Sequence, residues 1–155
     1  MRCDIRKTIM TDNHTSAQRS YNMSRIRSKD TKPEERVRKE LFSRGFRYRK
    51  NVKELPGKPD IVLKKYNTVV FVNGCFWHMH DCGRFTLPKT NLDYWKEKLQ
   101  RNVKRDSENE KKLRSLGWKV IVIWECQLNK DRLNKTIDDL CFEITSNEAR
   151  KKNRE

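Results

Sequence analysis

One segment of the chain decides both its fold and its chemistry, and it reads Val69-Val70-Phe71-Val72-Asn73-Gly74-Cys75-Phe76-Trp77-His78-Met79-His80-Asp81-Cys82. Its first half is apolar and rich in β-branched residues, which is typical of a buried strand. Its last eight residues, from Cys75 to Cys82, hold two of the three histidines and two of the five cysteines of the chain. The segment therefore predicts a strand that leads directly into a metal-binding loop.

The spacing of Cys75, His80 and Cys82 lets one tight loop surround a metal ion. A closed tetrahedral site needs a fourth ligand, and Cys126 is the best candidate because it follows the apolar run 119–125. Thiolates with one imidazole favour zinc over magnesium or calcium. The alternative is cysteines that merely pack in a core. A closed zinc site would be structural and would leave His78 free for acid–base chemistry.

The charge of the chain indicates its partner. The 155 residues suit one domain, of which 34% are hydrophobic and 37% charged, and the formal net charge is +16. Such an excess of positive charge suggests a polyanion, most readily nucleic acid. A membrane surface is the alternative, but the sequence has no basic amphipathic helix of the interfacial kind.

Cysteine usage and hydropathy predict a reducing cytoplasm. The apolar runs are too short to span a membrane, and residues 1–7 lack the apolar region of a signal peptide. Five cysteines are an odd number, and three of them cluster with histidine, which argues against a disulfide framework.

The first firm helix is predicted to begin at Thr31. Thr31 suits the N-cap, Pro33 the first turn and Glu34 the third helical position, which is the pattern of a capping box. Val37 and Leu41 continue one buried face. Glu34 can serve the cap alone, or it can use its inward position to approach a catalytic centre, and both interpretations stay open.

A hairpin is predicted after this helix. Gly45 ends the helix, residues 46–49 alternate like a strand, and Asp60 opens a short strand at 61–63. A turn at 64–67 returns the chain into a strand at 68–72. This pairing would place Asp60 near Val72 and Asn73, although an aspartate before a strand is common without any function.

A long helix is predicted from Asn91 to Leu116, with its core stripe at Trp95, Leu99, Val103, Leu113 and Leu116. Asn102 and Asp106 fall on or beside this stripe. A carboxylate that points inward needs a partner. For Asp106 that partner is either an arginine, in a purely structural role, or His78, whose ring it would orient.

The remaining elements are a strand and a helix. The apolar strand 119–124 is expected to be central and parallel to a neighbour, and a last helix runs from Lys135 to about Thr145, with Cys141 as a packing residue. The predicted organisation is a flexible N-terminal arm (1–18), a catalytic domain (19–145) and a charged C-terminal tail (146–155). His14 in the arm is expected to be an exposed histidine.

Four strings of the sequence together resemble one family, the very-short-patch-repair (Vsr) DNA mismatch endonucleases. They are Leu55–Asp60, Val70–Cys82, Asn102–Asp106 and Gly117–Cys126. The resemblance runs in order from about Arg19 to Leu128. It implies an α/β, restriction-endonuclease-like (PD-(D/E)XK) three-layer fold, with a mixed central sheet flanked by helices and a structural zinc site.

The resemblance also implies an activity. Such enzymes nick the DNA strand 5′ of the thymine in T:G mismatches that arise from deamination of 5-methylcytosine, and so initiate very short patch repair. The implied cofactors are catalytic magnesium and structural zinc. The implied partner is mismatched double-stranded DNA, bound by a monomer in the bacterial cytoplasm. Other mismatch-repair proteins are candidate further partners.

The residue roles follow position by position. Asp60 matches the magnesium-binding aspartate and Val72 the residue whose main-chain carbonyl helps to coordinate that ion. His78 matches the catalytic histidine, Asp106 its supporting carboxylate and Glu34 an active-site glutamate. The zinc ligands match Cys75, His80, Cys82 and Cys126. The aromatic residues that wedge into DNA match Phe76, Trp77 and Trp95, although Trp95 also suits an ordinary helix core.

Asn73 departs from the family pattern, which has histidine here in its better-known members. Asparagine cannot act as a general base or carry positive charge, but it can hydrogen-bond a phosphate oxygen or a metal-bound water. We therefore expect His78 to transfer the proton and Asn73 to position or stabilise. The rival interpretations are a restriction-type endonuclease with another site preference and a zinc-stabilised DNA-binding module without catalysis.

Overall fold

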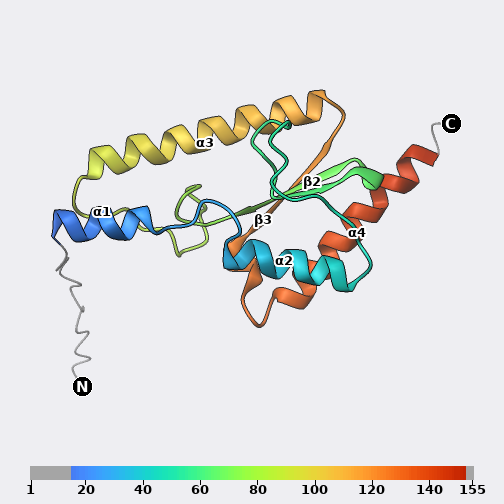
Figure 1. Ribbon diagram of the computed structural model, residues 1–155, viewed down its shortest axis with the longest axis horizontal. Helices are drawn as coiled ribbons and strands as arrows, with labels where there is room; N and C mark the ends of the chain where they lie inside the picture. The colour runs from blue at the N-terminus through green and yellow to red at the C-terminus, as the bar shows by residue number, and fades with distance from the viewer. Residues whose placement is uncertain (1–14, 153–155) are drawn as a thin grey trace, which may run out of the picture.

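The computed structural model describes residues 15–152, and its centre is a mixed three-stranded sheet (Figure 1). The strands are β1 (Ile61–Leu63), β2 (Thr68–Asn73) and β3 (Lys119–Trp124). β1 and β2 form the predicted antiparallel hairpin, joined by the short 3-10 helix η1 (Lys64–Tyr66). β2 and β3 are parallel, so their carboxyl ends meet, with Asn73 opposite Trp124.

The prediction that 119–124 is the central strand is wrong. The sheet order is β1-β2-β3, so β2 is central and β3 lies at an edge of the described sheet. The apolar character of β3 has another cause, because helices cover both faces of the sheet and bury its side chains from above and below. Hydrophobicity reports burial of a strand's faces and not its number of strand neighbours.

Two helices cover one face of the sheet, and a third covers the other (Figure 1). The helices α2 (Lys32–Ser43) and α4 (Leu133–Lys152) bury Val37, Leu41 and Ile137 against inward side chains such as Val70 and Ile121. On the opposite face, α3 (Leu92–Ser115) contributes Leu113, which packs against alternate strand residues including Val69 and Val120. The strands thus alternate their side chains between two cores, as the pleat requires.

The start of α2 is confirmed, but its cap differs from the predicted capping box. Thr31 is the N-cap residue, yet its side chain accepts no hydrogen bond from the helix. Its hydroxyl instead donates to Glu34 Oε1 (2.9 Å), and the Asp30 N–H donates to Glu34 Oε2 (2.8 Å). At the other end Gly45 has φ +88°, the left-handed conformation expected for a glycine that ends a helix.

Two predictions of regular structure are wrong in detail. Residues 46–49 form no strand: Arg49 alone pairs with β1, in an isolated antiparallel bridge to Val62, while Phe46 and Tyr48 pack into the core. On α3, Val103 is 40% exposed and Leu116 62% exposed, whereas Leu99 and Leu113 are fully buried. The helix is longer than the small sheet beneath it, so only part of its stripe finds a core.

The ends of the described chain also differ from the predicted boundaries. The helix α1 (Ser16–Ser24) crosses the predicted end of the arm at residue 18, while residues 1–14, His14 included, lie outside the described part. The helix α4 continues to Lys152, past the predicted end near Thr145. Cys141 packs against the core as expected. Within residues 15–152, no helix combines the length and apolarity needed to cross a membrane.

Candidate active site and metal-binding cluster

Asp60 lies where the hairpin begins, and its carboxylate is tied to the end of β2. Its Oδ2 accepts a hydrogen bond from the Val72 N–H (2.8 Å). The pKa of Asp60 is raised from 3.8 to about 6, chiefly by burial and also by the negative charge of Glu34, while the Val72 N–H and Arg38 oppose the shift. A carboxylate whose charge is this poorly solvated is well suited to bind a cation.

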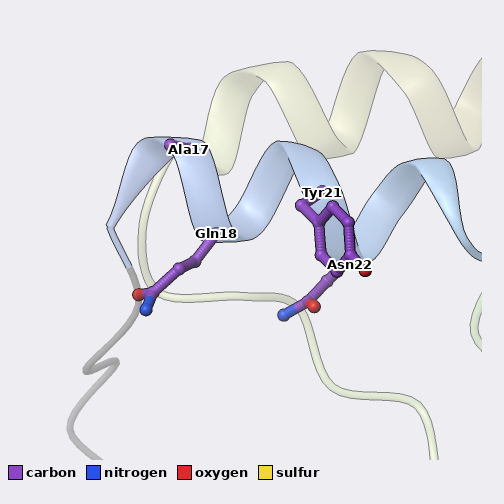
Figure 2. A pocket seen from close by; sticks show the side chains of 4 residues that line it. All are labelled: Ala17, Gln18, Tyr21 and Asn22. Carbon is purple, nitrogen blue, oxygen red and sulfur yellow. The ribbon is translucent and has the colours of Figure 1, made fainter.

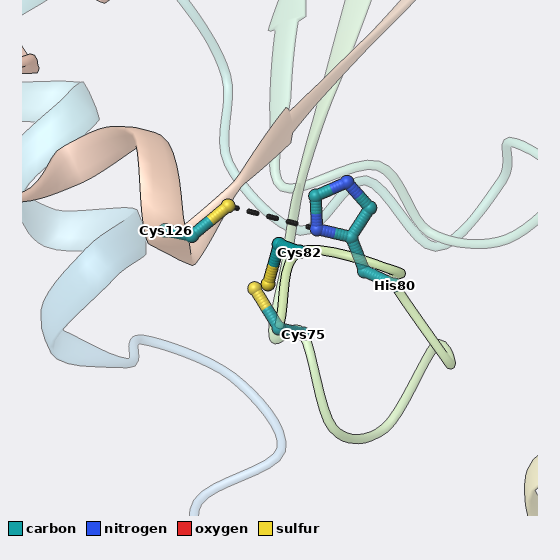
Figure 3. A group of neighbouring side chains, drawn as sticks. All are labelled: Cys75, His80, Cys82 and Cys126. Carbon is teal, nitrogen blue, oxygen red and sulfur yellow. Dashed lines mark hydrogen bonds between the residues drawn. The ribbon is translucent and has the colours of Figure 1, made fainter. Parts of the chain in front are cut away.

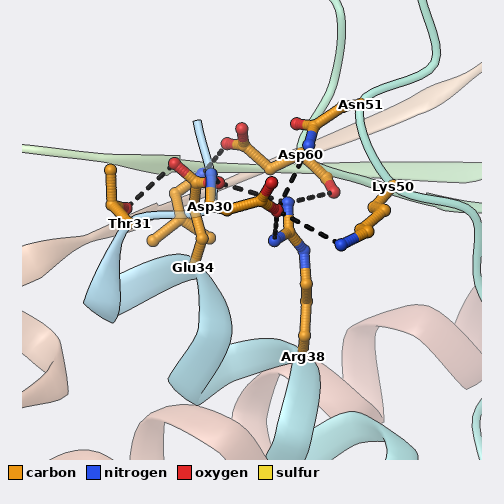
Figure 4. A network of polar contacts seen from close by, with 8 residues as sticks. Asp30, Thr31, Glu34, Arg38, Lys50, Asn51 and Asp60 are labelled. Carbon is orange, nitrogen blue, oxygen red and sulfur yellow. Dashed lines mark hydrogen bonds and ion pairs between the residues drawn. The ribbon is translucent and has the colours of Figure 1, made fainter. Parts of the chain in front are cut away.

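Glu34 and Asp60 belong to a buried polar network at the start of α2 (Figure 4). Glu34 is only 4% exposed, which confirms its inward position. Arg38, one turn further along the helix, donates to Glu34 Oε2 (3.1 Å) and to the Asp60 main-chain oxygen (3.1 Å). Glu34 therefore combines both interpretations, since it serves the start of α2 and lies beside Asp60.

His78 and Asp106 come from different elements and meet in a hydrogen bond. His78 lies in the loop after β2, and Asp106 lies on α3; His78 Nδ1–H donates to Asp106 Oδ2. The arginine alternative is weak, because Arg105 Nε is 4.0 Å from the other carboxylate oxygen and is largely exposed. The inward carboxylate of Asp106 thus has the imidazole as its partner.

An open cleft of about 320 Å³ lies along these groups. His78, Asp106 and Asn73 line it together with Trp124, so the ends of β2 and β3 and the middle of α3 face one space. A second hollow, of about 380 Å³, lies on α1 and is lined by Ala17, Gln18, Tyr21 and Asn22 (Figure 2). The α1 hollow has no acid–base pair, whereas the cleft has one.

The four predicted metal ligands converge at one point (Figure 3). The ligand atoms of Cys75, His80, Cys82 and Cys126 all lie within 4.8 Å of one another, and His80 Nδ1 is 3.6 Å from Cys126 Sγ. A tetrahedral zinc with Zn–S bonds of about 2.3 Å has ligand separations of about 3.8 Å, so a small contraction closes the site. The residues fit a four-coordinate structural ion.

The surroundings of this cluster fit a metal as well. Burial raises the pKa of Cys75 to about 12, whereas the Arg84 backbone N–H lowers the pKa of Cys82. Buried thiolates need a compensating positive charge, which a bound metal ion provides. The ring of His80 stacks on Trp124, with centroids 4.0 Å apart and planes inclined by 4°. This stacking fixes the orientation of the imidazole.

Aromatic side chains form a cluster between the loop and the start of α3. The Phe76 ring lies 5.1 Å from that of Trp77 and 5.6 Å from that of Trp95. Trp95 belongs to neither sheet core, so it is no ordinary core residue of the helix. The Lys98 ammonium lies 5.4 to 5.6 Å from the rings of Trp77, Tyr94 and Trp95. The three predicted wedge residues thus form one partly exposed group.

Comparison with known proteins identifies the family. The family model described as DNA mismatch endonuclease Vsr matches residues 11–84. A type II nicking enzyme of Neisseria meningitidis serogroup A, V.NmeAIP, is 52% identical over 136 residues, which cover 84% of this chain and 97% of that protein. The DNA mismatch endonuclease Vsr of Escherichia coli K12 is 43% identical over 77% of this chain and 76% of its own length. The chain belongs to the Vsr family.

Vsr membership supports a DNA mismatch endonuclease as the activity of the chain. The segment matched by the Vsr model contains Glu34, Asp60 and His78. Asp106 and Cys126 lie beyond it, and the structure brings both to the positions predicted from the motifs. The structure therefore brings His78 to Asp106, and Cys126 to the other three residues of the cluster.

Sequence reasoning missed three residues at the Vsr site. Arg38 has a signal, since it follows Glu34 by four positions and so shares its inward helix face. Trp124 also has one, because parallel pairing places the end of β3 beside the loop after β2. Lys98 has none that distinguishes it from the other lysines of α3.

Proposed function

We propose that the protein is a magnesium-dependent, strand-specific endonuclease that nicks DNA 5′ of the thymine in T:G mismatches produced by deamination of 5-methylcytosine. The observation that carries this proposal is the His78–Asp106 pair, which lies beside Asp60 near the carboxyl ends of β2 and β3. A polarised imidazole and a buried carboxylate are the groups that metal-assisted phosphodiester hydrolysis requires.

The roles of the side chains follow from their hydrogen bonds. Asp60 and the Val72 carbonyl would hold Mg²⁺, which when bound supplies charge stabilisation at the scissile phosphate and a more acidic water. Because Nδ1–H of His78 donates to Asp106, its Nε2 is left to accept or deliver the proton. Glu34 supports this site from α2, and Asn73 in the cleft hydrogen-bonds a phosphate oxygen or water.

The Cys75, His80, Cys82 and Cys126 cluster would bind zinc in a structural role. Its loop also carries Phe76, Trp77 and His78, so the ion would hold the wedge and the catalytic histidine in one unit. Inserted aromatic faces offset part of the cost of separating a base step, and a mismatched step is easier to open. We assign Phe76, Trp77 and Trp95 to this wedge.

The wider assignments rest on the same features. The mixed sheet with helices on both faces and Asp60 before a hairpin support a PD-(D/E)XK fold. We propose that the protein acts as a monomer on mismatched duplex DNA in the bacterial cytoplasm, at the nucleoid. Residues 19–145 would form its catalytic domain. The net charge of +16 supports binding to the phosphate backbone that weakens steeply with salt.

The deciding experiment uses a duplex with one T:G pair, each strand labelled separately, with and without magnesium. The expected product is a single nick 5′ of the thymine, in that strand only and only with magnesium. A duplex left uncut under both conditions would refute the proposal. A variant Asp60→Ala that still binds the mismatch without nicking would exclude a non-catalytic DNA-binding module.

A second candidate is a nicking enzyme with another site preference. It is favoured by relatives such as V.NmeAIP and V.XorIIP of Xanthomonas oryzae, which are named as type II nicking enzymes. Cleavage of a fully paired duplex at a defined sequence, as fast as that of the T:G duplex, would support this candidate over mismatch repair.

A further inference from the structure

Arg38 carries the most deeply buried positive charge among the described residues, and the proposed catalytic roles do not include it. Its side chain is 6% exposed, and its guanidinium bridges three groups (Figure 4). It donates to Asp30 Oδ1 (2.6 Å), to Glu34 Oε2 (3.1 Å) and to the main-chain oxygen of Asp60 (3.1 Å). Arg38 thus contacts Asp60, the proposed magnesium ligand, and Glu34 beside it.

Stability alone does not account for Arg38. Within residues 15–152, its Nε is the buried side-chain nitrogen that has no hydrogen-bond partner. A buried charge with an unsatisfied N–H destabilises the fold, and buried ion pairs can often be replaced by apolar residues without loss of stability. The neighbouring positions Val37 and Leu41 show that this side of α2 accommodates apolar side chains fully.

The geometry of the guanidinium fits a positioning role. A planar fork can hold several acceptors in fixed directions, which an ammonium group cannot. Through Asp60 O it fixes the backbone from which the Asp60 carboxylate projects, and through Oε2 it fixes the Glu34 carboxylate. Its positive charge also lowers the pKa of Asp60, against the effects of burial and of Glu34.

Asp30 completes this arrangement from the segment before α2. Its carboxylate accepts from Arg38 and from Asn51 Nδ2 (3.4 Å), and its own N–H donates to Glu34 Oε2 (2.8 Å). Its backbone has φ +52°, a left-handed conformation that aspartate tolerates better than most residues. The network is therefore built around the guanidinium from three separate segments.

We infer that Arg38 is a positioning residue, which orders the Glu34 and Asp60 carboxylates for the catalytic divalent cation. This inference rests on the proposed function, in which the divalent cation is catalytic. Mutation of a residue that orients metal ligands through hydrogen bonds typically changes metal affinity or activity by about 10- to 100-fold. Substitution of Arg38 should therefore reduce activity and metal affinity by more than a loss of stability explains.

The test is Arg38→Lys, which keeps the charge and removes the fork. Single-turnover nicking should slow by about 10- to 100-fold. The Mn²⁺ concentration that half-saturates the protein should rise severalfold. This concentration is measured from the EPR signal of free Mn²⁺, in the presence of a T:G duplex with a non-hydrolysable linkage at the cleavage site. The matched control is Arg44→Lys, at the end of the same helix, where the arginine pairs with Asp138 on α4. It should keep both values within about twofold of wild type.

A structural role would give another result. If Arg38→Lys lowered only the melting temperature and left nicking and Mn²⁺ binding within twofold, the inference would be wrong. If that variant does not fold, Asp30→Asn serves instead, since Asp30 is 34% exposed and asparagine accepts its backbone conformation. Asp30→Asn should slow nicking at least threefold, and an unchanged rate and Mn²⁺ affinity would overturn the inference. A wild-type protein that nicks no duplex would refute the proposed function, while the Mn²⁺ titration would still test Arg38.

Discussion

His78 and Asp106 are 28 positions apart in the sequence, yet His78 Nδ1–H donates a hydrogen bond to the Asp106 carboxylate. One belongs to the loop that carries the metal-ligand cluster and the other to the long helix α3. The pair therefore joins the loop of the metal-ligand cluster to α3, and it sets which ring nitrogen of His78 is available in the cleft. Several consequences of this relationship can be measured.

His78→Ala should reduce nicking of a T:G duplex by at least about 100-fold, because general acid–base groups contribute about 10²- to 10⁴-fold. Asp106→Asn should reduce it by about 10- to 100-fold, since the amide keeps a hydrogen bond but no longer stabilises a charged ring. Single-turnover rates at saturating magnesium measure both effects. Near wild-type nicking by His78→Ala would refute its assignment.

Asn73→Ala should have a smaller effect than His78→Ala. Asn73 lines the cleft but has no proton to exchange at neutral pH, so it can only position water or phosphate. We expect a loss of about 3- to 10-fold in the nicking rate, consistent with removal of one hydrogen bond. A loss as large as that of His78→Ala would mean that Asn73 has a central part in catalysis.

Local patterns predicted the elements of this fold well. The hairpin and the starts of α2 and α3 follow from spacing and alternation, because those signals depend on a few adjacent residues. The convergence of Cys75 with Cys126 follows because each cysteine comes directly after one of two parallel strands. The position of β3 at the sheet edge could not be read in this way. Its side chains are buried by helices, and burial has the same apolar signature whether helices or strands cause it.

Polar residues on inward faces were harder to predict. The choice between histidine and arginine as the partner of Asp106 depends on how the loop lies against α3, which no local pattern specifies. Arg38 was missed because a charged residue on a buried face interrupts the apolar pattern, although its spacing from Glu34 places both on one face. Its contact with the Asp60 main chain, like the His78–Asp106 pair, joins residues far apart in the sequence.

Removal of one metal ligand should separate structural zinc from ordinary cysteine packing. Wild-type protein should contain about one zinc per chain, and Cys82→Ser should lose it and melt roughly 10 °C lower, because structural zinc sites contribute directly to folding. The matched control is Cys141→Ser, since Cys141 packs against the core between the sheet and α4 and lies outside the cluster. It should keep its zinc. Full zinc content in Cys82→Ser would exclude Cys82 as a ligand.

Asp60→Asn should stabilise the magnesium-free protein while abolishing nicking. Folding raises the pKa of Asp60 from 3.8 to about 6, so the folded state favours the protonated acid. That contribution to stability is complete below pH 4 and is lost as the pH rises through 6. Asparagine resembles the protonated acid at every pH. The variant should therefore be more stable by about 2 kcal/mol at pH 8, from a shift of about two units at 1.36 kcal/mol each, reduced for partial solvation.

Urea denaturation of the zinc-loaded proteins at several pH values measures this difference. It should shrink as the pH falls from 7 towards 4, where wild type and Asp60→Asn carry the same charge at this position. A constant difference across that range would show that the gain comes from another source than the carboxylate. Added magnesium should stabilise wild type alone, since the variant lacks the anionic oxygen.

Trp77→Leu should weaken discrimination for the mismatch more than general DNA binding. Trp77 is partly exposed and packs edge-on against Phe76 at 5.1 Å, so the aromatic cluster is available to stack on opened bases. Base–aromatic stacking contributes about 1–3 kcal/mol per base, which corresponds to roughly 5- to 150-fold in Kd for the T:G duplex. The paired duplex, held through its phosphates, should lose much less affinity. Phe142→Leu is the control, because this aromatic is 73% exposed on α4, and both of its Kd values should stay at wild-type levels. An equal loss for both duplexes in Trp77→Leu would assign Trp77 to the structure of the loop and not to a wedge.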